Sequence, residues 1–282
     1  MSVPLEFHLF KVGHCSHPEC VTQRGGRWAT VRFPALAGLL IHPQRGPMLF
    51  DTGYSDAFLS ATRPFPERFY RWVTPMSLPP EETLATQLAH HGYTPADIRH
   101  LFVSHLHADH VAGLSDFPQA HFFALRAEVD AMRLRSRIGA LRRGFLPALV
   151  PEDFHSRLSF AEDLRRMTLA RSMKPFTEGF DLLGDGSVIG VALPGHTAGQ
   201  MGLLFREASG RDVFLVADAC WSLDDVRNDR PPTWVASQLF ANKRAYLDTF
   251  RGLGQLLARR DDLLIVPSHC ESTWRQVRDE AC

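Results

Sequence analysis

The sequence has no excess charge of either sign, because 31 Lys and Arg residues balance 31 Asp and Glu residues among 282 positions. A balanced chain creates no long-range field that would attract a polyanion, which argues against a nucleic-acid partner. It also lacks an apolar run long enough to span a bilayer, and its first ten residues lack the cationic start of a leader. We therefore expect a cytoplasmic protein without a membrane span.

Cysteine is scarce and odd in number, with five copies at Cys15, Cys20, Cys220, Cys270 and Cys282. This is no framework for a small disulfide scaffold, so we expect free thiols in a reducing compartment. Internal repeats and linkers rich in Gly, Ser or Pro are also missing. With 45% hydrophobic residues, the chain is expected to form a single domain over residues 1–282.

Histidine is instead abundant, with fourteen copies, and is densest directly after the apolar residues 101–103. In an extended segment, residues two apart point the same way, so His105 and His107 can reach one ion. Asp109 and His110 follow where the chain turns toward a helix, and can face a second position. Four ligand-type side chains within six residues predict a metal site.

Apolar periodicity predicts a layered α/β arrangement. Strands are expected at 5–12, 30–41, 47–50, 101–104, 121–125, 188–193, 201–205, 213–217 and 263–266. Helices are expected at 81–91, along the arginine-rich stretch 126–143, at 162–171, at 234–259 and near Trp274. Strands on each side of mixed helical segments favour two sheets packed face to face with helices outside.

The segment from His105 to His110 resembles the His-x-His-x-Asp-His motif of the metallo-β-lactamase superfamily, and the resemblance extends over nearly the whole chain. It implies a four-layer αββα sandwich of the metallo-β-lactamase type. Asp51, in the turn Asp51-Thr52-Gly53, matches the first short motif of that superfamily. By the resemblance, Asp51 supports the site from behind by orienting a ligating histidine.

Three further matches follow apolar strands in the expected order: His196 within Pro194–Gly199, Asp218 after 213–217, and His269 after 263–267. The resemblance implies two divalent metal ions, one held by His105, His107 and His196, the other by Asp109, His110 and His269, with Asp218 bridging them. Nitrogen-rich ligation without thiolate favours zinc, while iron, manganese or cobalt fit similar ligands. A hydroxide held by the ions would be the nucleophile, and Asp109 or Asp218 would carry the proton to the leaving group.

Within the superfamily, the chain is most similar to the N-acyl homoserine lactonases and their relatives. The likeness lies in residues 12–15, 46–53, 104–113 and 218–220. One departure is Trp221, which stands where those lactonases place a tyrosine that hydrogen-bonds the substrate carbonyl. An indole can donate but cannot accept or ionise there. Despite this departure, the motifs shared with that group predict a metallo-hydrolase of carboxylic esters or lactones, of the N-acyl homoserine lactonase type.

Alternatives remain open at this level. One alternative is an acyl thioesterase acting on acyl-CoA or acyl carrier protein, which would use the arginines between 126 and 143 as a basic binding surface. The simpler interpretation of these arginines is a solvated helix face partly paired with Glu128 and Asp130. A mononuclear iron site like that of persulfide dioxygenases uses many of the same positions. A regulatory or binding module that has kept its metals is the non-enzymatic alternative.

Two stretches rich in apolar side chains are not explained by the metal motifs, at 54–80 and 130–180. They are expected to form a lid, or else to pack on outer helices or across a homodimer interface. In the lid hypothesis, Phe69 and Trp221 line an apolar channel for a small acyl or aromatic substrate above the metals.

Overall fold

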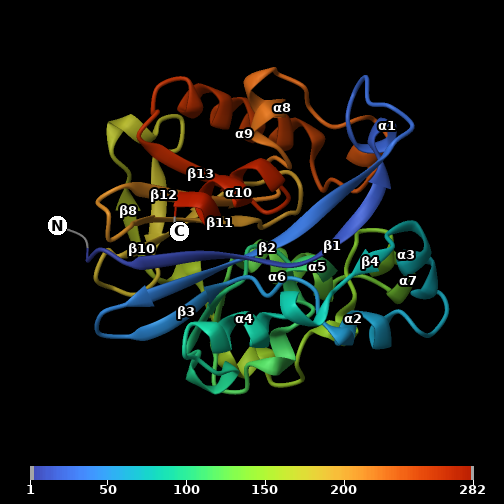
Figure 1. Cartoon of the computed structure of the whole chain (residues 1–282), viewed down its shortest axis with the longest axis horizontal. Helices are drawn as coiled ribbons and strands as arrows, with labels where there is room; N and C mark the ends of the chain where they lie inside the picture. The colour runs from blue at the N-terminus through green and yellow to red at the C-terminus, as the bar shows by residue number, and fades with distance from the viewer. Residues whose placement is uncertain (1–2, 281–282) are drawn as a thin grey trace.

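The computed structural model describes residues 3–280 as two β-sheets that face each other, with helices on both outer sides (Figure 1). The seven-stranded sheet has the order β4 (Met76–Ser77), β1 (Glu6–Pro18), β2 (Thr30–His42), β3 (Gly46–Phe50), β5 (His100–Phe102), β6 (His121–Ala124), β7 (Leu158–Phe160). The six-stranded sheet has the order β13 (Leu263–Pro267), β12 (Asp212–Ala217), β11 (Met201–Arg206), β10 (Val188–Ala192), β9 (Glu178–Asp181), β8 (Arg165–Thr168). The expected four-layer αββα sandwich is confirmed.

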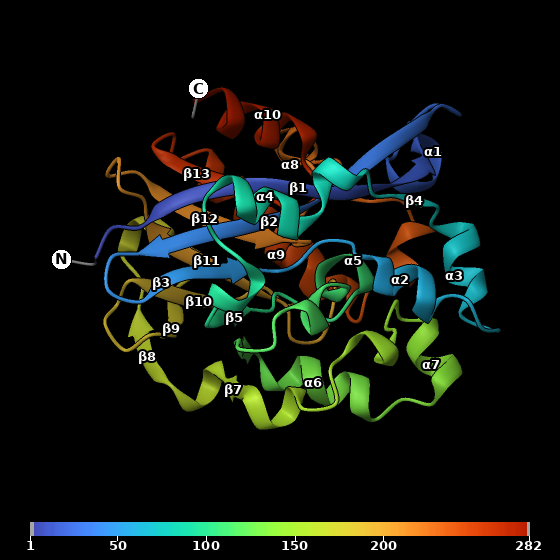
Figure 2. The same cartoon turned by 60° about the horizontal axis from the view of Figure 1, so that its bottom comes forward.

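The helices lie outside the two sheets (Figures 1 and 2). They are α1 (Glu19–Thr22), α2 (Asp56–Ala61), α3 (Arg68–Val73), α4 (Leu84–His90), α5 (Ala108–Val111), α6 (Arg126–Arg133), α7 (Arg137–Leu141), α8 (Leu223–Arg227), α9 (Lys243–Leu257) and α10 (Glu271–Glu280). Among the described helices, none is both long and apolar enough to cross a bilayer.

Alternation along single strands shows why the layers form. On β12, Val213 and Leu215 point into the core between the sheets, while Phe214 and Val216 join the cluster under α8 and α9. On β3, Met48 enters the core between the sheets, and Leu49 joins the cluster on the opposite face. Because side chains on a strand alternate between faces, strands that are apolar on both faces must be covered on both.

Strand ends position the candidate site. β3 pairs in parallel with β5, and β12 pairs in parallel with β13, so the carboxyl ends of each pair lie at one edge. The chain turns sharply there, with left-handed backbone at Asp51 (φ 59°) and at Ala217 (φ 47°). Such a conformation is uncommon outside glycine and concentrates at functional sites.

One expected helix is wrong, and another is shorter than expected. Residues 162–171 contain β8, which pairs antiparallel with β9 and whose Arg165 contacts the buried carboxylate of Asp181. The helix expected over 234–259 begins only at Lys243, because Asn242 caps it by accepting from the backbone N–H groups of Arg244 (3.0 Å) and Ala245 (3.1 Å). The terminal helix expected near Trp274 is present as α10.

Candidate metal centre

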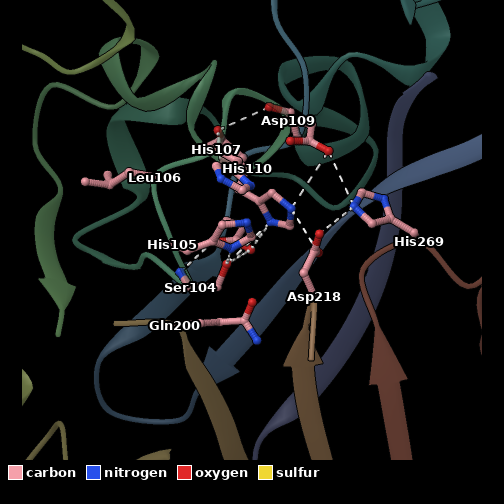
Figure 3. Close-up of polar contacts among 12 residues, drawn as sticks. Ser104, His105, Leu106, His107, Asp109, His110, Gln200, Asp218 and His269 are labelled. Carbon is pink, nitrogen blue, oxygen red and sulfur yellow. Dashed lines mark hydrogen bonds and ion pairs between the residues drawn. The ribbon is translucent and has the colours of Figure 1, made fainter. Parts of the chain in front are cut away.

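Five chain segments meet at the shared edge of the two sheets, and their polar side chains converge (Figure 3). Three groups of side chains there could each hold a metal ion, since their ligand atoms lie within 4.8 Å of one another: His105, His107, His196; His105, His110, Asp218; Asp109, His110, His269. The structure therefore brings together all seven side chains that the sequence predicts as ligands.

The first group is made only of imidazoles. Nδ1 of His107 lies 3.0 Å from Nε2 of His196, although 89 residues separate them along the chain. Two ligand atoms bound at about 2.05 Å in a tetrahedral zinc site would stand about 3.3 Å apart. The spacing of these two nitrogens thus suits a single shared ion.

The second and third groups meet around the carboxylate of Asp218. Nε2 of His269 lies 3.4 Å from Oδ2 of Asp109 and 3.2 Å from Oδ2 of Asp218. Asp218 also approaches His110 and His196, with oxygen-to-Nε2 distances of 3.2 and 3.3 Å. Figure 3 shows Asp218 between the side chains of His110 and His269, as expected for the bridging ligand that the sequence hypothesis predicts.

Four of the five histidines use one ring nitrogen to hold the ring in place. His105 Nδ1 donates to Ser104 Oγ (2.9 Å) and His110 Nδ1 donates to Asp51 Oδ2 (2.8 Å). His107 Nε2 donates to the Arg143 carbonyl (2.7 Å), and His269 Nδ1 to the Pro34 carbonyl (2.6 Å). The remaining nitrogen of each ring faces the cluster, which is the usual arrangement behind metal-binding histidines.

Asp51 holds two residues of the ligand segment, Ser104 and His110, by hydrogen bonds on the side away from the cluster. Besides His110, its carboxylate accepts the backbone N–H of Ser104 (2.8 Å) and the Ser104 hydroxyl (2.7 Å). Thr52 adds a hydrogen bond from its Oγ1 to the His110 carbonyl (2.9 Å). The Asp-Thr-Gly turn thus lies behind the ligand segment, as the sequence hypothesis places it.

Unpartnered atoms indicate that the cluster fits metal ions. His105 Nε2, His110 Nε2 and Asp218 Oδ1 are buried and make no well-formed hydrogen bond within the described chain, although the last two lie 3.2 Å apart. Buried polar atoms without partners are costly, and cations bound among these groups would satisfy them. The donor set of imidazole and carboxylate groups without thiolate suits zinc and similar divalent ions.

Burial sets the protonation of the cluster. Burial lowers the pKa of His105 and of His196, the latter to about 3, so both rings are neutral and able to bind a metal. For His110 and His269, burial is outweighed by neighbouring carboxylates, Asp218 foremost, and the pKa is raised. Metal binding at these two rings therefore competes with protons.

Trp221 lies at the cluster, while Phe69 lies elsewhere on the surface. The Trp221 indole packs edge-on against Phe33 and His196, and it lines a cavity of about 250 Å³ together with Phe33 and His269. Phe69 on α3 is 47% exposed and packs against Phe65 and Trp72. Phe69 is not among the described residues that line this cavity.

The stretch 130–180 is more ordered than expected from its sequence. It contributes β7, β8 and β9 to the two sheets, and four of its apolar side chains, Phe145, Leu146, Leu149 and Phe154, belong to a buried core. The part at 143–145 also supports the cluster. A Cβ at Gly144 (φ 75°) would stand 2.9 Å from the His107 ring, so only glycine fits there.

The arginines between 126 and 143 do not pair with Glu128 as the sequence interpretation expects. Arg126 pairs with Asp163 (2.7 Å) and Arg137 with Glu67 (2.6 Å), while Arg143 donates to the Phe240 carbonyl (2.6 Å). Glu128 is not a surface partner of these arginines: it is fully buried and accepts hydrogen bonds from two backbone N–H groups. Sequence reasoning missed this residue, because its burial depends on how the loops fold over α6.

The other predicted features have mixed outcomes. Cys15, Cys20, Cys220 and Cys270 are free thiols, and Cys282 lies outside the described residues. The expected lid and homodimer stay predictions, as does the acyl carrier partner.

Two facing sheets with a histidine and carboxylate cluster at their strand ends define a metal-dependent hydrolase. The chain belongs to the metallo-beta-lactamase superfamily, whose family model matches residues 31–269. It is 31% identical to a probable metallo-hydrolase of Mycobacterium tuberculosis over 258 residues, covering 86% of this chain and 77% of the relative.

Lactonases are also among the similar proteins. The N-acyl homoserine lactonase AttM of Azorhizobium caulinodans is 26% identical over 256 residues, covering 88% of this chain and 86% of the relative. A solved N-acyl homoserine lactone hydrolase, with N-hexanoyl-L-homoserine bound at its catalytic metal centre, superposes with a TM-score of 0.73 at 18% identity. That alignment covers 100% of this chain and 97% of the other and shows a shared fold.

Proposed function

We propose that this chain is a dinuclear metal-dependent lactonase that opens the ring of an N-acyl homoserine lactone or a related cyclic ester. In this proposal His105, His107 and His196 bind the first ion, Asp109, His110 and His269 bind the second, and Asp218 bridges them. The observation that carries the proposal is the set of histidines whose outer nitrogens are held by Ser104, Arg143, Asp51 and Pro34. Rings fixed in this way have their free nitrogens directed at common points.

Ions bound at this cluster would act as Lewis acids toward the ester carbonyl and would lower the pKa of a bound water. The protein's own groups would do the rest. Asp109, whose carboxylate lies 3.9 Å from His110 Nε2 and 3.4 Å from His269 Nε2, would take a proton from the attacking water and pass it to the leaving oxygen. Asp218 could also carry this proton, in addition to its proposed role as a ligand shared by both ions.

The cavity beside the cluster could hold part of a substrate. Phe33 and Trp221 line it together with the proposed metal ligand His269, and polar residues such as Arg32 and Asp225 complete its lining. At about 250 Å³ it can take part of a short acyl chain or one ring. The similarity to lactonases over most of the chain favours a lactone over a thioester.

The test combines metal content with substrate preference. The zinc-loaded protein should hold close to two ions per chain by elemental analysis, and should turn over acyl homoserine lactones faster than acyl-CoA thioesters or aryl esters. His105→Ala should abolish turnover and lose one ion, whereas the exposed His90→Ala on α4 should change neither. A preference for thioesters would contradict the lactonase proposal, and one tightly bound iron would contradict the dinuclear site.

A further inference from the structure

Glu128 is a buried carboxylate close to the cluster that the proposed reaction does not use. It lies in the first turn of α6, the helix that follows β6 along the chain, and its exposed fraction is 0%. Its two oxygens accept different backbone groups: Oε1 accepts the N–H of Leu106 (2.9 Å), and Oε2 accepts the N–H of Gly199 (3.1 Å). No Lys or Arg side chain among the described residues pairs with it.

These two donors belong to the two loops that carry the first group of histidines. Leu106 stands between His105 and His107, and Gly199 follows His196 by three positions. The first loop follows β5 in the seven-stranded sheet, and the second joins β10 to β11 in the six-stranded sheet. A single carboxylate therefore bridges the sheets at the point where the 3.0 Å contact between His107 and His196 must be kept.

Close packing leaves little freedom in this bridge. A Cβ at Gly199 would come within 2.3 Å of the Glu128 backbone nitrogen, so this loop lies directly on the start of α6. Beside it, the Met201 N–H donates to the Ser104 carbonyl (2.8 Å), which adds a second link between the same two loops. Glu128 thus completes a rigid connection rather than a loose surface contact.

A carboxylate is a costly choice for a purely structural bridge. Burial raises the pKa of Glu128, and hydrogen bonds including those from Leu106 and Gly199 offset only part of that effect. The three imidazoles of the first group carry no charge when they bind a cation, so a buried negative charge next to their loops is favourable there.

We propose that Glu128 is a positioning residue for the first metal site: its carboxylate fixes the loop of His105 and His107 against the loop of His196. The inference rests on the proposed metal-binding function, but it concerns affinity and geometry at one of the two sites. It makes no demand on which ester is hydrolysed.

The experiment compares Glu128→Gln with Asp130→Asn, an exposed carboxylate on the same helix. Glutamine keeps the size of the side chain but offers one carbonyl oxygen, so one backbone N–H faces an NH₂ group. Metal affinities come from competition with a chelator, and first-site geometry from the visible absorption of the cobalt-substituted protein. Thermal unfolding of the metal-free protein reports stability alone.

Glu128→Gln is expected to weaken one ion about ten- to hundredfold, leave the other unchanged and shift the cobalt spectrum. Glu128→Asp should restore part of the affinity, and Asp130→Asn should behave like the unaltered protein. Unchanged affinity for both ions would overturn the inference. An equal loss of affinity at both sites, accompanied by a lower unfolding temperature of the metal-free protein, would also overturn it. If the unaltered protein failed to bind an ion at the first site, the proposed function itself would fall.

Discussion

The indole nitrogen Nε1 of Trp221 donates a hydrogen bond of 3.1 Å to Oδ2 of Asp218. Three aromatic rings, those of Phe33, His196 and Phe240, pack edge-on around the same indole and hold it in this orientation. Since an indole has a single N–H donor, Trp221 is occupied with the carboxylate. In the lactonases that the chain resembles, a tyrosine at this position binds the substrate carbonyl; the N–H of Trp221 instead contacts the proposed bridging ligand.

Trp221→Phe should therefore lower kcat about tenfold, because an aromatic ring remains in place but a hydrogen bond to a charged group is lost. Metal content should stay near that of the unaltered protein. The measurement is kcat and KM on a lactone together with elemental analysis. Trp28→Phe, at a tryptophan that is 90% exposed, is the control. An unchanged kcat would show that the hydrogen bond to Asp218 has no role in turnover.

Asp218→Ala should lower metal content and activity together, since Asp218 contacts His110, His196 and His269 at once. Asp51→Ala should reduce activity with a smaller loss of metal, because Asp51 holds His110 from behind. Elemental analysis and turnover of the two variants in parallel give the comparison. Normal metal and normal turnover in Asp218→Ala would refute the bridging assignment.

Phe69→Ala tests the lid hypothesis for residues 54–80. If α3 covers the substrate, KM for long-chain lactones should rise several-fold while hydrolysis of a small ester stays constant. Trp274→Ala provides a matched loss of an aromatic side chain on α10, which lies away from α3 in Figure 2. An equal effect of Phe69→Ala on all substrates would mean that this ring is structural.

The ion pair between Arg137 and Glu67 should contribute stability that depends on pH. The guanidinium donates twice to the Glu67 carboxylate, both at 2.6 Å, and lowers its pKa below the ordinary 4.5. The contribution is complete above pH 4.5 and is lost as the pH falls through the lower pKa of the folded state.

A double-mutant cycle of Glu67→Gln and Arg137→Gln measures this pair. By denaturant unfolding of the metal-free protein at pH 7, the coupling should be small but measurable, since Arg137 is largely exposed. At a pH below the folded-state pKa it should vanish. A coupling that is the same at both pH values would contradict the assignment.

Cys15 should resist alkylation in the folded protein. Burial raises the pKa of its thiol to about 12, so the reactive thiolate is nearly absent at pH 8.5. Cys20 is half-buried and should react with iodoacetamide first. Tandem mass spectrometry can locate the modified cysteine, and unfolding in denaturant should expose Cys15. Rapid labelling of Cys15 in the folded state would contradict its burial.

Local sequence was sufficient to place Asp51, His196, Asp218 and His269 after apolar strands. The expectation that these residues meet at one site came from the resemblance to the metallo-β-lactamase superfamily. By contrast, β8 reads Arg-Arg-Met-Thr, without a clear apolar period, and is a strand because β9 pairs with it. Short edge strands of this kind depend on tertiary context more than on propensity.

The role of Glu128 could not be read from the sequence for a similar reason. Its neighbours Arg126 and Asp130 are exposed and polar, which makes the helix look like a solvated face. Only the two loops that fold over its first turn show that one carboxylate points inward.

The parallel pairing of β12 with β13 has a consequence for how the chain folds. His269 reaches Asp218 only after β13 has docked, and His107 meets His196 across 89 intervening positions. Contacts so distant in sequence form late, because the entropy of closing long loops is lost before they are made. A nascent chain still lacking β13 would also lack His269, so it could not present the complete set of seven side chains.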